Sequence, residues 1–251
     1  MARIDLNSDL GESYGRYTLG CDAEVLQYVS SCNIACGFHA GDPSVMRKTV
    51  KLAHERGVAL GAHPGFPDLQ GFGRREMKVS PDDAYAYVMY QVGALQAFVH
   101  AEGTVLHHVK PHGALYNQAA KDPALADAIA QAVHDIDPAL VLVGLANGEL
   151  IRAGRELGLK TASEFFVDRN YDDDGHLLNR AYPNALITDE GIALSRLVRV
   201  IITGKLETVG GKTIELQPDT VCVHGDGAKA LEFTSRIRSE LTAEGIEITP
   251  V

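Results

Sequence analysis

The sequence predicts an α/β fold built on a mainly parallel β-sheet. Short apolar runs alternate with longer amphipathic ones along the whole chain, and this alternation is typical of repeated βα units. The pattern recurs roughly every 35 residues, the length of one βαβ unit, so the 251 residues contain about seven units. This length is also usual for one closed α/β barrel. No linker rich in Ser, Pro or Gly interrupts the pattern, and we expect a single domain over residues 1–251.

Each expected element follows from a local signal. The apolar runs predict strands at 4–6, 32–35, 59–62, 106–110, 141–145, 161–165 and 220–223. The amphipathic stretches predict helices at 22–29, 43–56, 80–101, 122–135, 148–157, 188–203 and 227–244. The third helix has a strong start signal, because Ser80 can cap it and Pro81 suits its first turn. Two β-rich runs flank Gly210 and Gly211, which predicts a small hairpin insertion near residues 206–216.

Composition excludes several classes of function. The 33 acidic and 23 basic side chains give a formal charge of −10, which repels nucleic-acid phosphates and anionic lipids, so we expect neither as a partner. The chain shows no signal-peptide core and no apolar run of membrane-spanning length, and we expect it in the cytoplasm. The four cysteines form no CxxC pair and are expected to be reduced. Ten histidines are a high count, and histidine often transfers protons or binds metals near neutral pH.

Polar and ionisable side chains gather at the carboxyl ends of the predicted strands. In βα folds these ends converge on one face, which carries the active site, and the pattern therefore favours an enzyme over a binding module. In chain order the residues are Asp5, Asn7 and Asp9, then His39 and Asp42, His63, Lys110 and His112, Glu164, Asp168 and Arg169, and finally His224 and Asp226.

Several of these residues have more than one interpretation. Asp5, Asn7 and Asp9 share one face of a strand, where they can bind a metal, act as acid and base, or bond loop backbone. Asp42 is also a standard helix N-cap. A lysine facing a barrel interior must either pair with Asp5, Asp9 or Glu164 or have a lowered pKa, which makes Lys110 a candidate catalytic residue.

A long loop after the third strand offers a second type of group. Gly71 and Gly73 precede Arg74 and Arg75, and such a loop can close over a substrate while an arginine grips its phosphate or carboxylate. The alternative is a surface loop with one salt-bridged arginine. Gly211-Lys212-Thr213 is not a Walker A loop, because Leu206 stands where the first glycine belongs, so any nucleotide site is unconventional.

Six stretches together resemble the LamB/YcsF family. They are DLNSDLGE, SCNIACGFHAGDP, GAHPGFPDLQGFGRR, HHVKPHGALYNQA, FFVDRNY and VCVHGD, spread from residue 5 to residue 226. The chain departs from the family pattern at Leu69, where members often carry arginine. The resemblance implies a seven-stranded β/α barrel like that of polysaccharide deacetylases. It also implies cleavage of the cyclic amide 5-oxoproline to L-glutamate, coupled to ATP hydrolysis, in a complex with the 5-oxoprolinase subunits B and C.

The resemblance also carries the family's polar positions over to this chain. They are Asp5, Asn7, Asp9, His39, Asp42, His63, Lys110, His112, Asn117, Asp168, Arg169, His224 and Asp226. Opening a lactam requires activation of its carbonyl, and we expect ATP, bound by this chain or mainly by its partners, to phosphorylate the amide oxygen. Lys110 or an arginine would then stabilise the oxyanion, and a His–Asp pair would transfer protons.

The expected roles divide into catalysis and binding. The catalytic candidates are Lys110, His112, His39, His63 and Asp9, with one of the three histidines as the base. The candidates for binding a small anionic substrate are Asp5, Asn7, Asp42, Arg74, Asn117, Glu164, Asp168, Arg169, His224 and Asp226.

Two other functions stay open. One is a metal-dependent deacetylase of carbohydrate-type substrates with Asp9, His39 and His63 around zinc or another divalent ion, although the paired-His helix spacing of such enzymes is absent. The other is a noncatalytic subunit that only binds substrate for its partners. Outside the deacetylase alternative, we expect no metal.

Overall fold

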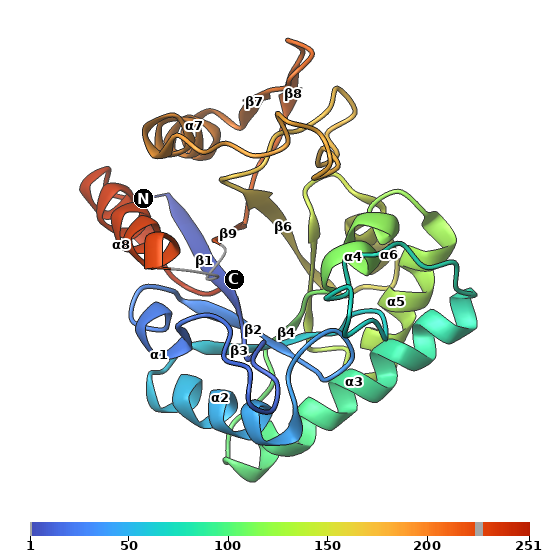
Figure 1. Cartoon of the computed structure of the whole chain (residues 1–251). Coiled ribbons are helices and arrows are strands. Elements are labelled where there is room, and N and C mark those ends of the chain that lie inside the picture. The colour runs from blue at the N-terminus through green and yellow to red at the C-terminus, as the bar shows by residue number, and fades with distance from the viewer. Residues whose placement is uncertain (1, 224–227) are drawn as a thin grey trace.

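The computed structural model describes residues 2–223 and 228–251, and its centre is a closed barrel of parallel strands (Figure 1). Pairing of the last barrel strand with the first closes the sheet. The barrel strands are β1 (Arg3–Leu10), β2 (Ser31–Ala35), β3 (Ala59–His63), β4 (His108–Val109), β5 (Val141–Leu145), β6 (Lys160–Phe166) and β9 (Thr220–Cys222). Each of the seven predicted strands is present, and the predicted fold class is confirmed.

Helices surround the barrel on its outer side (Figure 1). They are α1 (Asp22–Val25), α2 (Pro43–Glu55), α3 (Pro81–Ala101), α4 (Gly113–Ala119), α5 (Pro123–Ile136), α6 (Glu149–Glu156), α7 (Glu190–Thr203) and α8 (Ala228–Ala243). The predicted start of α3 is confirmed, because the Ser80 hydroxyl accepts a hydrogen bond from the Asp83 amide. Helix α1 is shorter than predicted, and α4 was not predicted because its seven residues are too few for a clear helical period.

Two small additions complete the sheet structure. Strands β7 (Lys205–Glu207) and β8 (Thr213–Glu215) form the predicted antiparallel hairpin. Strand β10 (Glu247–Ile248), which was not predicted, pairs with Arg3 and Ile4 of β1, next to the segment of β1 that pairs with β9. It therefore extends the sheet at the amino end of β1.

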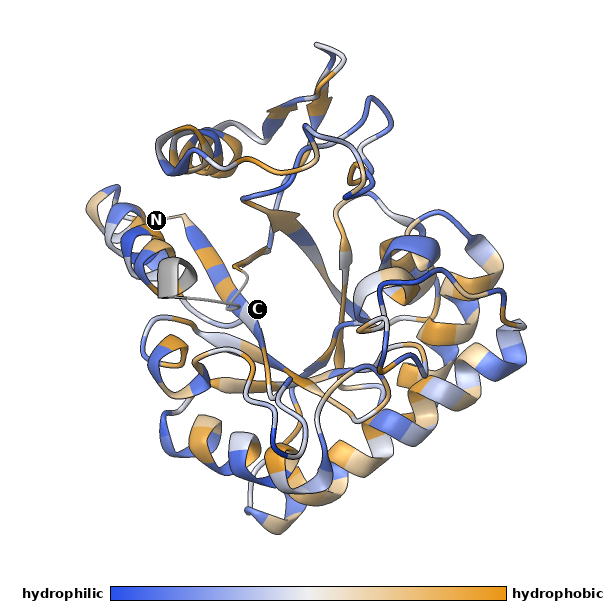
Figure 2. Ribbon diagram, in the orientation of Figure 1, coloured by the Kyte–Doolittle hydropathy of each residue, from blue (hydrophilic) through white to orange (hydrophobic). Residues whose placement is uncertain are grey.

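Strand β1 is apolar on the outside and polar on the inside of the barrel, whereas Val141, Val143 and Ala162 of β5 and β6 form a separate apolar cluster. Figure 2 shows polar and apolar residues alternating along β1. Leu6 and Leu10 pack in the apolar core, and Asn7 and Asp9 belong to a polar network in the interior. A polar barrel interior is unusual, because buried polar groups must all find partners.

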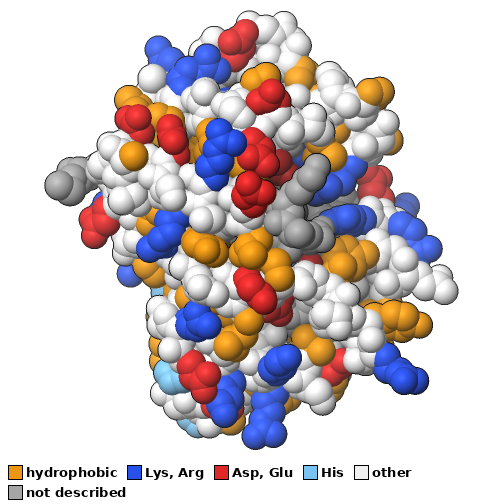
Figure 3. Space-filling view, turned by 60° about the vertical axis from the view of Figure 1, so that its left-hand side comes forward, with side chains coloured by type: hydrophobic (Ala, Val, Ile, Leu, Met, Phe, Trp, Pro, Cys, Tyr) orange, Lys and Arg blue, Asp and Glu red, His pale blue; other side chains and the backbone are white. Residues whose placement is uncertain are grey.

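The charges on the surface are mixed in sign. On the face shown in Figure 3, Lys and Arg side chains are interspersed with Asp and Glu. Among the described residues, no helix has the length and apolar character needed to cross a membrane.

Candidate active site

A cavity of about 570 Å³ lies at the carboxyl ends of the barrel strands. Asp9 of β1, His63 at the end of β3, Lys110 just after β4 and Phe166 at the end of β6 line it. His112, which precedes the first turn of α4, also faces this cavity. The volume lies within the usual range of small-molecule sites, roughly 300–1,000 Å³.

Lys110 is almost completely buried beneath this cavity, and its ammonium group is paired. Its Nζ lies 2.7 Å from Glu164 Oε1 and 3.0 Å from Asp9 Oδ1, and it donates to Asn7 Oδ1 at 3.2 Å. Burial alone would lower the pKa of Lys110, but Asp9, Cys222 and Glu164 raise this pKa well above its ordinary value. Of the two predicted alternatives, the paired lysine is therefore confirmed and the lysine of lowered pKa is wrong.

A second polar layer supports this ion pair from within the barrel. Asn33 of β2 donates to Asn7 Oδ1 and to Asp9 Oδ1, both at 2.8 Å. His108 of β4 lies 2.8 Å from Asn33 Oδ1, so the network crosses from β1 to β4. These contacts fix Asp9 and Lys110 in position below the cavity.

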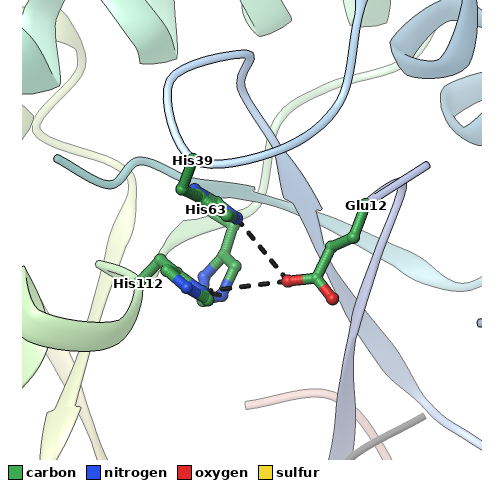
Figure 4. A group of neighbouring side chains, drawn as sticks. All are labelled: Glu12, His39, His63 and His112. Atoms are coloured by element: carbon green, nitrogen blue, oxygen red, sulfur yellow. Dashed lines mark hydrogen bonds and ion pairs between the residues drawn. The ribbon is translucent and has the colours of Figure 1, made fainter. Parts of the chain in front are cut away.

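Three imidazoles and one carboxylate meet beside Asp9 (Figure 4). His39 comes from the loop between β2 and α2, and its ring stacks on that of His112 at a centroid distance of 3.7 Å. His112 Nδ1 lies 2.9 Å from His63 Nε2, and His63 Nε2 lies 3.3 Å from Asp9 Oδ2. Glu12 Oε1 lies 3.5 Å from His39 Nε2 and 3.8 Å from His112 Nδ1. We call Glu12, His39, His63 and His112 the imidazole cluster.

Burial sets the protonation state of this cluster. The pKa values of His39 and His112 lie well below the ordinary value for histidine, first because burial disfavours the charged form. The neighbouring histidines repel a second positive charge and lower both pKa values further. The two rings are therefore neutral at pH 7.

Two glycines in the loop after β3 allow this tight packing. A Cβ on Gly65 would lie 2.7 Å from His39 Nδ1, and a Cβ on Gly73 would lie 2.7 Å from His39 Cβ and 2.8 Å from His112 Cδ2. Gly73 also has φ = +62°, which favours glycine. The predicted long loop thus covers two imidazoles of the cluster closely.

Basic side chains surround the upper part of the cavity. Arg74, Lys121, Arg169 and Arg180 line it. Burial, followed by repulsion from Arg180, lowers the pKa of Arg169 to about 10, so both guanidinium groups remain charged at neutral pH. Arg75, next to Arg74, instead pairs with Asp68. We call Arg74, Lys121, Arg169 and Arg180 the basic rim; they line the cavity together with the acidic Glu76 and Asp122, and their guanidinium groups can bind a small anion.

The structure brings most of the predicted site residues together. Asp9, His63, Arg74, Lys110, His112, Asn117 and Arg169 line the cavity. Asn7, His39 and Glu164 lie in the layer of residues that contact them. The predicted His224 and Asp226 lie outside the described residues.

Besides Asn7 and Glu164, three predicted binding residues are not among those that line the cavity. Asp5 lies deeper in the barrel, where Ser30, Ser31 and Thr220 donate hydrogen bonds to its carboxylate, so it is also not the partner of Lys110. Asp42 caps α2, accepting from the amides of Ser44 and Val45 as its alternative interpretation predicted. Asp168 lies at the start of the loop after β6.

The cavity lining also includes residues that were not predicted from the sequence, among them Glu12, Tyr116 and Arg180. Glu12 directly follows Gly11 at the end of β1, and the rule that strand ends carry functional groups would have found it. Tyr116 lies on the unpredicted helix α4. Arg180 lies in the long segment between β6 and α7, whose path the sequence does not define.

The candidate metal ligands also differ from the predicted set. The imidazole cluster adds Glu12 and His112 to the predicted His39 and His63, while Asp9 contacts His63 from outside the cluster.

Comparisons with known proteins give the family of the chain and agree with the barrel fold. A model of the LamB/YcsF family matches residues 4–251. The A subunit of the 5-oxoprolinase from Bacillus subtilis (strain 168) is 57% identical over 251 residues, which cover 100% of this chain and 98% of that protein. The corresponding A subunit from Geobacillus kaustophilus (strain HTA426) is 60% identical over 248 residues, which cover 99% of this chain and 96% of that protein.

Solved structures show the same architecture. The crystal structure of a lactam utilization protein from Thermus thermophilus superposes with a TM-score of 0.93 at 46% identity, covering 99% of this chain and 100% of that one. A family 4 carbohydrate esterase from Streptomyces lividans, in complex with acetate, superposes with a TM-score of 0.50 at 12% identity. The match covers 98% of this chain and 91% of that one. The second likeness concerns the fold alone.

Proposed function

The chain belongs to the LamB/YcsF family, and from this membership we propose that it is the A subunit of an ATP-dependent 5-oxoprolinase. The reaction hydrolyses the cyclic amide of 5-oxo-L-proline. In net terms, 5-oxo-L-proline, ATP and two waters give L-glutamate, ADP, phosphate and a proton. The relatives named as A subunits of 5-oxoprolinase support the substrate, and the word subunit supports a complex, in which we propose subunits B and C as the partners. The four cysteines form no disulfide in the described structure, which fits the reducing cytoplasm, where ATP is available.

One observation carries the proposal: the cavity joins a fixed ammonium group to a basic rim. The substrate has a carboxylate at one end of its ring and the amide carbonyl at the other. An arginine of the rim, Arg74 or Arg169, can hold the carboxylate with two hydrogen bonds. Phe166 and Leu177, which also line the cavity, can contact the apolar ring. The carbonyl oxygen can then face Lys110.

Lys110 has the properties needed to stabilise charge at that oxygen. Its ammonium group is held by Asp9 and Glu164, so it needs no reorganisation when negative charge develops. ATP activates the amide by phosphorylating its oxygen, and the bound nucleotide belongs to this chain or to one of its partners. The opened ring nitrogen then needs a proton, and Asp9, whose carboxylate contacts Lys110 and His63, can relay one to it from water.

The test is an assay of the assembled complex. With subunits B and C present, the wild-type chain should release ADP and glutamate in a 5-oxoproline-dependent manner. We expect Arg74→Ala to raise the KM for 5-oxoproline more than it lowers kcat, whereas Arg75→Ala, the matched control that pairs with Asp68, should change KM little. His112→Ala should lower kcat, because it removes a ring in contact with His63.

The alternatives give different results. ATP hydrolysis without 5-oxoproline dependence would refute the substrate. A chain that binds 5-oxoproline while its His112→Ala variant supports wild-type turnover in the complex would instead be a noncatalytic binding subunit.

A further inference from the structure

Two imidazoles of the cluster point a ring nitrogen at each other. His63 Nδ1 lies 2.7 Å from the carbonyl oxygen of Lys110, and His112 Nε2 lies 2.8 Å from that of Phe72. A carbonyl oxygen only accepts hydrogen bonds, so these two nitrogens carry the protons of their rings. The remaining nitrogens, His63 Nε2 and His112 Nδ1, are 2.9 Å apart. In neutral rings both hold lone pairs, and no hydrogen bond can form between them.

The third imidazole, His39, has no hydrogen bond to any residue that the structure describes. His39 is 1% exposed, and neither of its ring nitrogens makes a hydrogen bond within the described structure. A buried polar group without a partner costs about 1–3 kcal/mol, so a side chain in this state points to a ligand. One ligand atom from each of Glu12, His39, His63 and His112 lies within 4.8 Å of the others.

We propose that Glu12, His39, His63 and His112 bind one divalent transition-metal ion. Three imidazole nitrogens and one carboxylate oxygen form a donor set that suits Zn²⁺ or a neighbouring transition metal, rather than Mg²⁺ or Ca²⁺ with their oxygen ligands. The carbonyl oxygens of Lys110 and Phe72 hold the outer nitrogens of two rings, as is usual for histidines that bind metals. A cation between the lone pairs removes their repulsion and gives His39 a partner.

The charges nearby favour a cation as well. With neutral rings, Asp9, Glu12 and Glu164 carry three negative charges below the cavity, and Lys110 supplies one positive charge among them. Arg74 adds positive charge from the exposed rim, where solvent screens it. Among these four groups a divalent ion would balance the remaining two negative charges, while Arg169 and Arg180 add positive charge elsewhere in the cavity lining. At this position it would supply Lewis-acid polarisation of a substrate carbonyl.

A shared proton between His63 and His112 is the competing explanation. It would satisfy the facing lone pairs, but it would leave His39 without a hydrogen bond, and it would not hold a metal. Metal analysis of the isolated chain therefore separates the two explanations.

The experiment uses the full chain without substrate, nucleotide or partners. After chelator treatment and removal of the chelator, Zn²⁺ is titrated by calorimetry, and the metal retained after desalting is measured by elemental analysis. We expect one Zn²⁺ per chain and a rise in Tm, because an ion that binds only the folded state stabilises it. Co²⁺ bound in the same site should give a visible absorption band that Zn²⁺ abolishes.

Variants locate the ion. Glu12→Gln and His39→Gln should each weaken Zn²⁺ binding by at least roughly 10- to 100-fold, while circular dichroism without metal confirms that they fold. His176→Ala is the matched control, because His176 belongs to a separate cluster with Asp172 and Asp174 and should leave the affinity unchanged. Absence of stoichiometric Zn²⁺ and Co²⁺ binding by the wild type would overturn the proposal, as would loss of the ion in His176→Ala or its retention in both cluster variants. Since this measurement involves no lactam chemistry, its outcome is independent of whether the chain is part of a 5-oxoprolinase.

Discussion

Replacing Lys110 with methionine tests how strongly the buried ion pair supports the barrel. Methionine fills a similar volume but removes the positive charge. The Lys110 ammonium group lies 2.7 Å from Glu164 and 3.0 Å from Asp9. Without it, the Glu164 carboxylate, which is 0% exposed, would face Asp9 with no positive charge between them. Removing one partner of a buried pair typically costs about 3–5 kcal/mol, because the other charge remains buried and uncompensated. For a chain of this size, each kcal/mol corresponds to roughly 2–4 °C, so Tm should fall by roughly 6–20 °C.

The assay is urea unfolding followed by far-UV circular dichroism, with the double variant Lys110→Met/Glu164→Gln as the comparison. Neutralising Glu164 removes the buried charge that makes the single change costly, so the double variant should be more stable than Lys110→Met. A loss below about 1 kcal/mol for the single variant would refute the reasoning. Losses that simply add across the two changes would also refute it, because they would show no coupling between Lys110 and Glu164.

Three further changes test other parts of the structure. Gly61→Ala should cost about 1–3 kcal/mol in urea unfolding, because its Cβ would overlap the His108 ring; Gly93→Ala, in open space on α3, should instead stabilise by about 0.5–1 kcal/mol. Equal losses of unfolding free energy in the Gly61→Ala and Gly93→Ala variants would contradict this expectation. Asp42→Ala should lower the free energy of unfolding by about 1 kcal/mol through loss of the α2 cap, and an unchanged value would show that the cap is unimportant. An aromatic disulfide reagent should label one thiol in the native chain, at partly exposed Cys21, and four after denaturation, because the other three cysteines are buried. Labelling of a native Cys21→Ser variant would show that a second thiol is accessible and would contradict this prediction.

The fold was predictable because each barrel strand has a strong local signal. Val141–Leu145 is a continuous apolar run, and β1 alternates polar and apolar residues, so both were found within a few residues. Strand β10 was missed for the opposite reason. Its two residues carry no pattern of their own, and its place is set by the free edge that β1 offers beside β9. Such an element follows from the tertiary structure rather than from local sequence.

The candidate site was predictable as a set of positions but not as a set of contacts. Asp9, His63, Lys110 and His112 all follow from one rule, that parallel strands bring their carboxyl ends together. The partners could not be chosen in the same way. The sequence allowed Asp5, Asp9 or Glu164 as the ion-pair partner of Lys110. The choice depends on how deep each carboxylate lies in the barrel, and Asp5 lies deeper, where it accepts hydrogen bonds from serine and threonine hydroxyls. Depth is a property of register and strand tilt, which spacing along one chain does not reveal.

The contacts divide the site into two parts with different capacities. Around Lys110 the ammonium group is matched, because Glu164, Asp9 and Asn7 each accept from it, while the second carboxylate oxygen of Glu164 makes no hydrogen bond within the described residues. A matched group of this kind is stable, and it keeps its charge fixed at one place for a substrate oxygen. In the imidazole cluster the groups are not matched, since His39 has no hydrogen bond within the described structure and the ring nitrogens of His63 and His112 face each other at 2.9 Å. Folding alone does not favour such an arrangement. The stability of the barrel therefore depends on the first part, while the second has the unused donor atoms that a ligand requires.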